Sequence, residues 1–283
     1  MHPIGTMPEL PDLEVIRAVL VRRIVDVQIL SVDVLRPLIV RNLLGGELDA
    51  HLAGRRFVDV QRCGKFLLLP LDDGNTLVTH PMLAGRLRYG LPLARNRTRD
   101  ALVIHLADGR ELRYNDAKDM GKVYLTHDLA QVPTFGDLGP EATDPALTLD
   151  GFRERLRPRR GEIKGVLVDQ TFVAGIGNAY ADEILWRAQI YPFRRRTSLS
   201  DEEVAALYEA IGTVLAEAIE ILSMRVGEEL DKEVRDFLAV HGKPGQPCPR
   251  CGGTISEVKQ SGSATHFCRA CQPGLMVAKG RKL

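Results

Sequence analysis

The sequence has little of several features that define whole classes of protein. Its 283 residues include one tryptophan, aromatic residues make up 5%, and no apolar run reaches the roughly 18 to 20 residues that a membrane-spanning helix needs. Basic residues exceed acidic residues by one, 38 against 37, so the chain as a whole is neither strongly basic nor strongly acidic. The start lacks the basic and then apolar pattern of a signal peptide. These absences favour a cytoplasmic protein with no membrane partner.

The charge that is present is unevenly distributed. The C-terminal segment from His241 holds the single acid Glu257 and seven basic residues, which are Lys243, Arg250, Lys259, Arg269, Lys279, Arg281 and Lys282. Two further basic runs, 153–160 and 194–196, precede this segment. Such clusters neutralise phosphates when they share one face of a protein, although each run alone is equally typical of a solvated surface.

Residue patterning predicts an α+β protein of several parts. Aliphatic and β-branched runs between residues 24 and 125 are typical of an antiparallel β-sandwich or barrel, with a helix over 8–25 in front of it. After a Pro- and Gly-rich connector the periodicity becomes helical, and Ser200 with Glu203 forms the signature of a capping box. We expect a sandwich domain over 7–136, a helical domain over 137–240 and a cysteine-containing module over 241–276.

Four of the five cysteines form the pattern C-x2-C-x16-C-x2-C, and they are Cys248, Cys251, Cys268 and Cys271. Two such pairs supply four thiolates to one tetrahedral zinc ion, and the segment between them has the pattern of a β-hairpin. A disulfide framework is the alternative, less favoured in a cytoplasmic chain. Four thiolates leave no open coordination position, so the predicted zinc is structural. The fifth cysteine, Cys63, lies in a strand pattern and is expected to be a small buried hydrophobe.

The stretch "AGIGNAYADEIL" places a glycine-rich turn at residues 175–177 directly before a helix that begins near Asn178. Backbone amides at such a helix N-terminus bind phosphate well, and Asn178 can cap the helix while it presents its amide group outward. For this segment alone, the alternative is a plain helix–turn–helix corner in which glycines allow close packing.

Four motifs occur in order along the chain, namely "MPELPDLE", "CGKFLLL", "AGIGNAYADEIL" and a four-cysteine hairpin that ends in "CRACQ". Together, over Met7 to Gln272, they resemble the formamidopyrimidine-DNA glycosylase / endonuclease VIII family of base-excision repair enzymes. The resemblance implies a β-sandwich and a helix-two-turn-helix domain with a zinc finger, which grip duplex DNA as a monomer while the damaged nucleotide is flipped out. It also implies a bifunctional enzyme, a DNA glycosylase with abasic-site lyase activity on oxidised bases.

The resemblance gives Pro8 a chemical role. If translation starts at Met7 and that methionine is removed, Pro8 becomes a terminal secondary amine with a pKa near 8, which can attack the sugar C1′. A start at Met1 would leave Pro8 an internal imide, so we interpret residues 1–6 as a misassigned or extra leader. Glu9 would then move protons, and Lys65 would act as a general acid or contact a phosphate. Taken singly, these residues would be an ordinary helix start and a solvated strand lysine.

Further positions match the DNA contacts of the family. In the helical domain they are Gly177 and Asn178 in the turn, Arg160 where a lysine is usual, and Lys164, which we expect on the same helix as Arg160. In the sandwich, Leu83 and Met120 stand where methionine and phenylalanine are usual and are expected to act as apolar wedges. Lys118 stands in place of an arginine.

Other positions depart from the family. Ser263 stands where an arginine usually grips phosphates, so either His266 or Arg269 compensates, or DNA binding is weaker and the second elimination step is in doubt. Asp119 places an unfavourable charge beside DNA. The choice between oxidised purines, such as formamidopyrimidines and 8-oxoguanine, and oxidised pyrimidines therefore stays open. So does the alternative of a relative that binds damaged DNA without catalysis, although binding alone would not need Pro8, Glu9 and Lys65 together.

Overall fold

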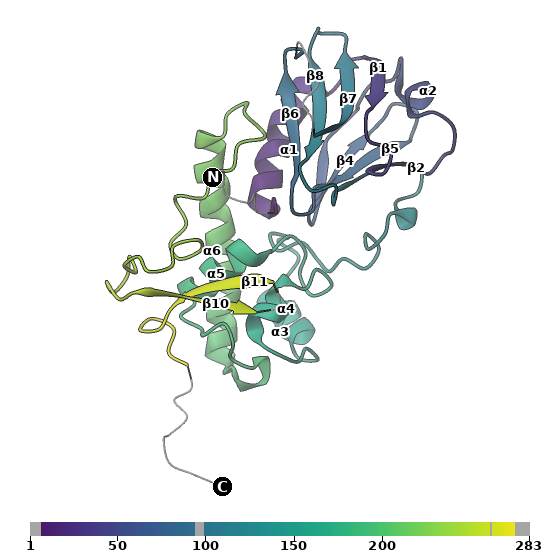
Figure 1. Ribbon diagram of the computed structural model, residues 1–283. Coiled ribbons are helices and arrows are strands. Elements are labelled where there is room, and N and C mark those ends of the chain that lie inside the picture. Colours follow the sequence, from purple (N-terminus) through teal and green to yellow (C-terminus); the bar gives the residue numbers. More distant parts are fainter. Residues whose placement is uncertain (1–6, 94–98, 261, 275–283) are drawn as a thin grey trace, which may run out of the picture. The chain divides into compact units, whose positions relative to one another are not determined.

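The computed structural model describes residues 7–93, 99–260 and 262–274 (Figure 1). The predicted leader over 1–6 lies outside the described residues, as do the last two positions of the predicted cysteine module and the basic residues Lys279, Arg281 and Lys282. The chain divides into two compact units, Met1–Leu138 with Ala218–Val234 and Gly139–Glu217 with Arg235–Leu283. The three domain boundaries inferred from the sequence stay a prediction.

The first unit begins with helix α1 (Leu10–Ile24), whose buried residues recur at helical spacing. Within the described residues, two sheets follow, with the strand orders β1-β7-β8-β6 and β2-β9-β5-β4-β3. The strands of the first sheet are β1 (Ile29–Val34), β7 (Asp100–Leu106), β8 (Glu111–Asp116) and β6 (Gly85–Gly90). Those of the second are β2 (Val40–Asn42), β9 (Lys122–Thr126), β5 (Thr76–His80), β4 (Phe66–Pro70) and β3 (Gln61–Cys63). The short helices α2 (Leu48–Leu52) and η1 (Leu129–Gln131) lie in connecting segments.

Side chains from α1 and from both sheets form one apolar core, which includes Leu20, Leu69 and Ile104. The predicted antiparallel β-sandwich is confirmed with one exception, because β2 pairs with β9 in parallel. These strands are far apart in the sequence, so no hairpin constrains them to run antiparallel. In strand β6, Arg86 and Arg88 alternate with the buried residues, as in a strand with one covered face.

The second unit combines helices with a β-hairpin. Its elements are α3 (Leu149–Leu156), α4 (Ile163–Val168), α5 (Asn178–Arg187), η2 (Arg196–Ser198), the first part of α6 (Asp201–Arg225), β10 (Ile255–Gln260) and β11 (Ser263–Cys268). Strand β11 packs against α5 (Figure 1). Helix α4 ends at Val168, after which the side chain of Asp169 accepts a hydrogen bond from Thr171 N at 2.9 Å and starts a turn.

The predicted capping box of α6 is confirmed. Ser200 N donates to Glu203 Oε2 at 2.8 Å, and Glu203 N donates to Ser200 Oγ at 3.3 Å. Among the described residues, no helix is both long enough and apolar enough to cross a membrane.

Candidate active site and nucleic-acid interface

Pro8 and Glu9 lie immediately before α1, and both are buried. Glu9 is the N-cap residue and forms a reciprocal capping box with Asp12, whose Oδ2 accepts from Glu9 N at 2.8 Å. Pro11 lies in the first turn, where the missing N–H costs no hydrogen bond of the helix. The local sequence therefore fixes the backbone at the start of α1 and holds Pro8 at its N-terminal end.

Lys65 lies in the tight turn between β3 and β4, after Gly64, whose positive φ of 55° suits glycine. The turn is tied to α1 through one side chain. Arg62 Nη1 donates to Gly64 O at 3.1 Å, while Arg62 Nε lies 3.0 Å from Glu14 Oε2 on the helix. The same helix carries Glu9 at its N-cap. The contacts of Arg62 with Gly64 and Glu14 therefore hold the turn of Lys65 against the helix of Glu9.

Glu9 and Lys65 are ionisable, yet they are only 2% and 8% exposed. Burial lowers the pKa of Lys65, and the charge of Glu9 opposes that shift. His80, at the end of β5, stacks on Phe66 with ring centroids 4.1 Å apart. Burial, together with the charge of Lys65, lowers the pKa of His80 to about 4, so its ring is neutral at pH 7. No sequence pattern predicted a role for His80, although it lies three residues before Leu83.

The expected wedge residues lie on two turns that pack against one side chain, Tyr114. A Cβ atom added at Gly85 would lie 2.2 Å from Tyr114 Oη, and one added at Gly121 would lie 1.9 Å from it. Both turns therefore need glycine to approach this hydroxyl. The exposed side chains that they carry include Leu83, Lys118 and Met120.

Two acids hold the turn over 116–121. Buried Asp116 accepts hydrogen bonds from two backbone amides of the turn, at 2.8 and 2.5 Å. Asp119, with a φ of 57°, forms an ion pair with Arg36, and its Oδ2 lies 3.9 Å from Arg99 Nη1. Two arginines of the same unit therefore balance part of the charge of Asp119, and its expected effect on DNA stays a prediction.

In the second unit, α5 begins at Asn178, and the N-cap residue is Gly177 rather than Asn178 as the sequence predicted. The Asn178 side chain points instead to the hairpin. Its Nδ2 donates to Ala264 O at 2.8 Å, and its Oδ1 accepts from Ser263 Oγ at 2.9 Å. Ser263, the expected departure from the family pattern, thus forms a hydrogen bond with a predicted DNA-contacting residue.

Lys164 is 8% exposed and is directed at the same hairpin. Its Nζ lies 2.6 Å from Asp182 Oδ1 and donates to Thr265 Oγ1 at 2.9 Å. Arg160 lies in the loop before α4, so the expectation that it shares a helix with Lys164 is wrong. Arg160 and Arg269 are both exposed.

Two consecutive acids of α5 bind the segments that form the zinc module. Asp182 Oδ2 accepts from His241 Nδ1 at 2.8 Å and from His266 N at 3.0 Å, while Glu183 accepts from three successive backbone amides over 239–241 at 2.7 to 2.8 Å. His266 is 4% exposed, and its Nε2 lies 3.2 Å from Glu257 Oε2. Because its ring is bound inside the protein, His266 is not placed to replace the missing arginine.

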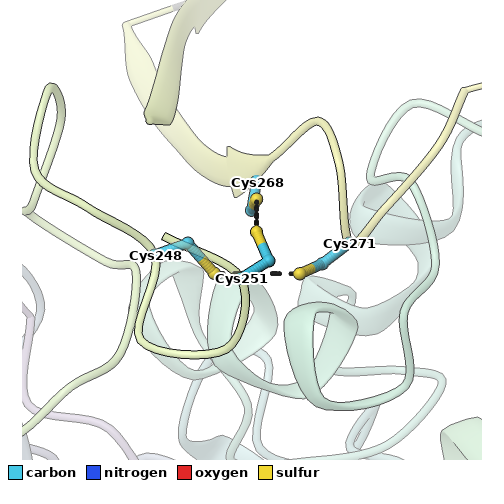
Figure 2. A group of neighbouring side chains, drawn as sticks. All are labelled: Cys248, Cys251, Cys268 and Cys271. Carbon is cyan, nitrogen blue, oxygen red and sulfur yellow. Dashed lines mark hydrogen bonds between the residues drawn. The ribbon is translucent and has the colours of Figure 1, made fainter. Parts of the chain in front are cut away.

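The sulfurs of Cys248, Cys251, Cys268 and Cys271 point toward one another (Figure 2) and all lie within 4.8 Å. The Cys248–Cys271 and Cys251–Cys268 Sγ separations are 3.8 and 3.4 Å. A tetrahedral zinc ion with Zn–S bonds of about 2.3 Å requires sulfurs about 3.8 Å apart, so the four thiolates fit one ion. The Cys pairs lie in matching turns, in which Gly252 N donates to Cys248 O and Gln272 N to Cys268 O, each at 2.8 Å.

Three domain models match successive parts of the chain. The formamidopyrimidine-DNA glycosylase N-terminal domain matches residues 7–123, its H2TH domain matches 138–227, and the zinc finger found in FPG and IleRS matches 245–274. The chain belongs to the formamidopyrimidine-DNA glycosylase family. The family, the fold class, the class of enzyme and the zinc finger inferred from the sequence are thereby confirmed.

Relatives match over most of their length. Formamidopyrimidine-DNA glycosylase of Heliobacterium modesticaldum is 41% identical over 276 residues, which cover 94% of this chain and 100% of the relative. The solved structure of Lactococcus lactis Fpg with DNA that contains an abasic site has a TM-score of 0.85 and 33% identity, over 94% of this chain and 100% of the other. The L. lactis protein bound to Fapy-dG-containing DNA has a TM-score of 0.84 at the same identity and coverage.

Proposed function

We propose that this chain excises oxidised bases of the formamidopyrimidine and 8-oxoguanine type from duplex DNA and then cleaves the strand, with Pro8 as the nucleophile. The observation that carries the proposal is the burial of Glu9, at the start of α1, and of Lys65, in the turn between β3 and β4. Withdrawing two ionisable groups from water is costly for a fold that has no use for them, and such groups are typical of active sites.

In the proposed reaction, the neutral secondary amine of Pro8 attacks the sugar C1′, and the C1′–N bond to the damaged base breaks. The base leaves with a proton, and the sugar ring opens to give an iminium that joins C1′ to Pro8. This cation acidifies the C2′ proton. Loss of that proton expels the 3′ phosphate and breaks the strand by β-elimination.

Glu9 and Lys65 are proposed to donate and accept the protons of the reaction. Glu9, next to the nucleophile, donates to the sugar ring oxygen and later accepts a proton. Lys65, whose pKa is lowered by burial, transfers a proton more readily than a surface lysine does, and in its charged form it attracts a phosphate. His80 stays neutral at pH 7 and so adds no further positive charge beside Lys65.

The DNA contacts are proposed as follows. Leu83 and Met120 fill the space that the flipped nucleotide leaves, and Lys118 reaches the opposite base. In the second unit, Gly177, Asn178, Arg160 and Arg269 contact phosphates, whereas Lys164 acts indirectly because it holds the hairpin in place. The zinc ion, bound by four thiolates, stabilises that hairpin and takes no part in the chemistry. We further propose that the protein acts as a monomer in the cytoplasm.

Borohydride trapping on a duplex with an abasic site tests the proposal. Protein started at Met7 and freed of its methionine should give a covalent adduct, and peptide mass analysis should locate it at Pro8. Protein that keeps residues 1–7 should give none, because its Pro8 nitrogen is an imide. The Pro8→Gly variant should bind DNA with nearly unchanged affinity but should no longer cleave the strand.

An adduct at Lys65 or elsewhere would refute the assignment of Pro8. No adduct from either protein, with normal DNA binding, would favour the second candidate, a relative that recognises damaged DNA without this chemistry. The observation that favours this second candidate is Ser263, which stands where the family has an arginine.

A further inference from the structure

Two basic runs that are 34 or more residues apart in the sequence meet in the second unit. The backbone at Gly161–Ile163 pairs with that at 194–196, since Arg196 N donates to Gly161 O and Ile163 N donates to Arg194 O, each at 2.9 Å. Glu162 and Arg195 form an isolated antiparallel bridge between them. The pairing brings Arg157 and Arg160 close enough to Arg196 to affect its ionisation.

Three of the eight arginines in these runs already have a carboxylate partner. Arg153 lies 3.0 Å from Asp150, and Arg159 lies 2.7 Å from Asp169. Arg194 is paired with Glu203. These ion pairs neutralise part of the basic character that the sequence shows.

Arg157, Arg160 and Arg196 differ, because the described residues offer none of them a carboxylate within ion-pair distance. Arg196 Nε is buried and has no hydrogen-bond partner among the described residues. Burial, followed by the charges of Arg160 and Arg157, lowers the pKa of Arg196. Three like charges that converge on one buried donor without a counter-ion are unfavourable unless an anion completes the group.

We propose that Arg157, Arg160 and Arg196 form a phosphate site that binds a backbone phosphodiester of duplex DNA. The guanidinium groups present forked donors that match phosphate oxygens, and Arg196 Nε supplies a donor that the protein leaves unused. The site reads no base, so it adds sequence-independent affinity. It deepens the proposed function and rests on it in one respect, namely that the ligand is DNA.

The test measures how DNA affinity depends on salt. Each phosphate that a protein neutralises on duplex DNA contributes about −0.9 to the slope of log K against log salt. Removing exposed Arg157 and Arg160 with the double change Arg157→Gln, Arg160→Gln should make the slope shallower by about 0.9 and should weaken binding of an undamaged duplex several-fold at low salt.

The matched control is Arg153→Gln, Arg187→Gln. It removes the same charge from two arginines that Asp150 and Glu217 already neutralise. Its slope should stay that of the unaltered protein. An equal change of slope in both double variants, or a change in neither, would overturn the site.

Borohydride trapping on the same proteins separates the two proposals. Trapping at Pro8 with an unaltered slope in the Arg157 and Arg160 variant would leave the proposed chemistry standing and remove the phosphate site. A shallower slope without any adduct would support the site and remove the chemistry.

Discussion

Asp182 offers a sharp test of how the zinc module is held, because its carboxylate is fully buried. It pairs with Lys164 at 2.6 Å and accepts hydrogen bonds from His241 and His266. The change Asp182→Asn preserves the shape of the side chain but leaves the ammonium of Lys164, itself 8% exposed, without its counter-charge. Breaking a buried ion pair in this way costs about 3 to 5 kcal/mol, which corresponds to a fall in Tm of about 6 to 20 °C.

The assay is unfolding of the zinc-loaded protein by denaturant, with zinc release followed in parallel by a chromogenic chelator. Glu217→Gln is the control, since it removes a carboxylate from an exposed pair with Arg187 and should cost at most about 1 kcal/mol. Adding Lys164→Met to Asp182→Asn should recover stability, because the unpaired cation is then absent. The reasoning is refuted if Asp182→Asn costs no more than the control.

The pH dependence has a definite sign. Burial opposes the ionisation of Asp182, but hydrogen bonds from His241 and His266 and the charge of Lys164 outweigh it and lower its pKa. An acid whose pKa falls on folding contributes stability that is fully present above its unfolded pKa of about 3.9 and is lost as pH falls through the lower folded value. The stability difference between the unaltered protein and Asp182→Asn should therefore shrink in strong acid, as urea unfolding between about pH 2 and 7 would reveal.

Two other predictions concern the zinc ion and the Asp119 turn. Chelation of zinc should unfold the β10–β11 hairpin and lower affinity for duplex DNA at least about tenfold, because Asn178 is bound to that hairpin; chelated protein that binds normally would contradict this. Asp119→Arg should destabilise the first unit through repulsion with Arg36, and the added change Arg36→Asp should recover it, with a coupling energy of about 0.2 to 1 kcal/mol in a double-mutant cycle. Additive effects in that cycle would contradict it.

Features set by neighbouring residues could be predicted from the sequence. The capping box at Ser200 and Glu203 and the four-cysteine spacing both depend on residues a few positions apart, and the structure contains both as expected. Predictions about Asn178 and Lys164 were less complete, because their partners Ser263, Ala264 and Thr265 lie about 85 to 101 positions away. No local pattern shows that these two polar side chains turn toward the hairpin.

Asp119 shows that the effect of a departure from a family motif cannot be predicted from the motif alone. Its neighbours in the sequence suggest an acid placed against DNA, and only the fold reveals that Arg36, 83 positions earlier, pairs with it. A charge reversal in the turn is tolerable when a distant segment supplies the opposite charge, because the ion pair balances part of the charge of Asp119. The turn keeps Lys118 and Met120 exposed, and Asp119, which is exposed too, is paired with Arg36. The same substitution in a relative without Arg36 would leave the acid without a counter-charge. We therefore expect the residues at positions 36 and 119 to change together among relatives.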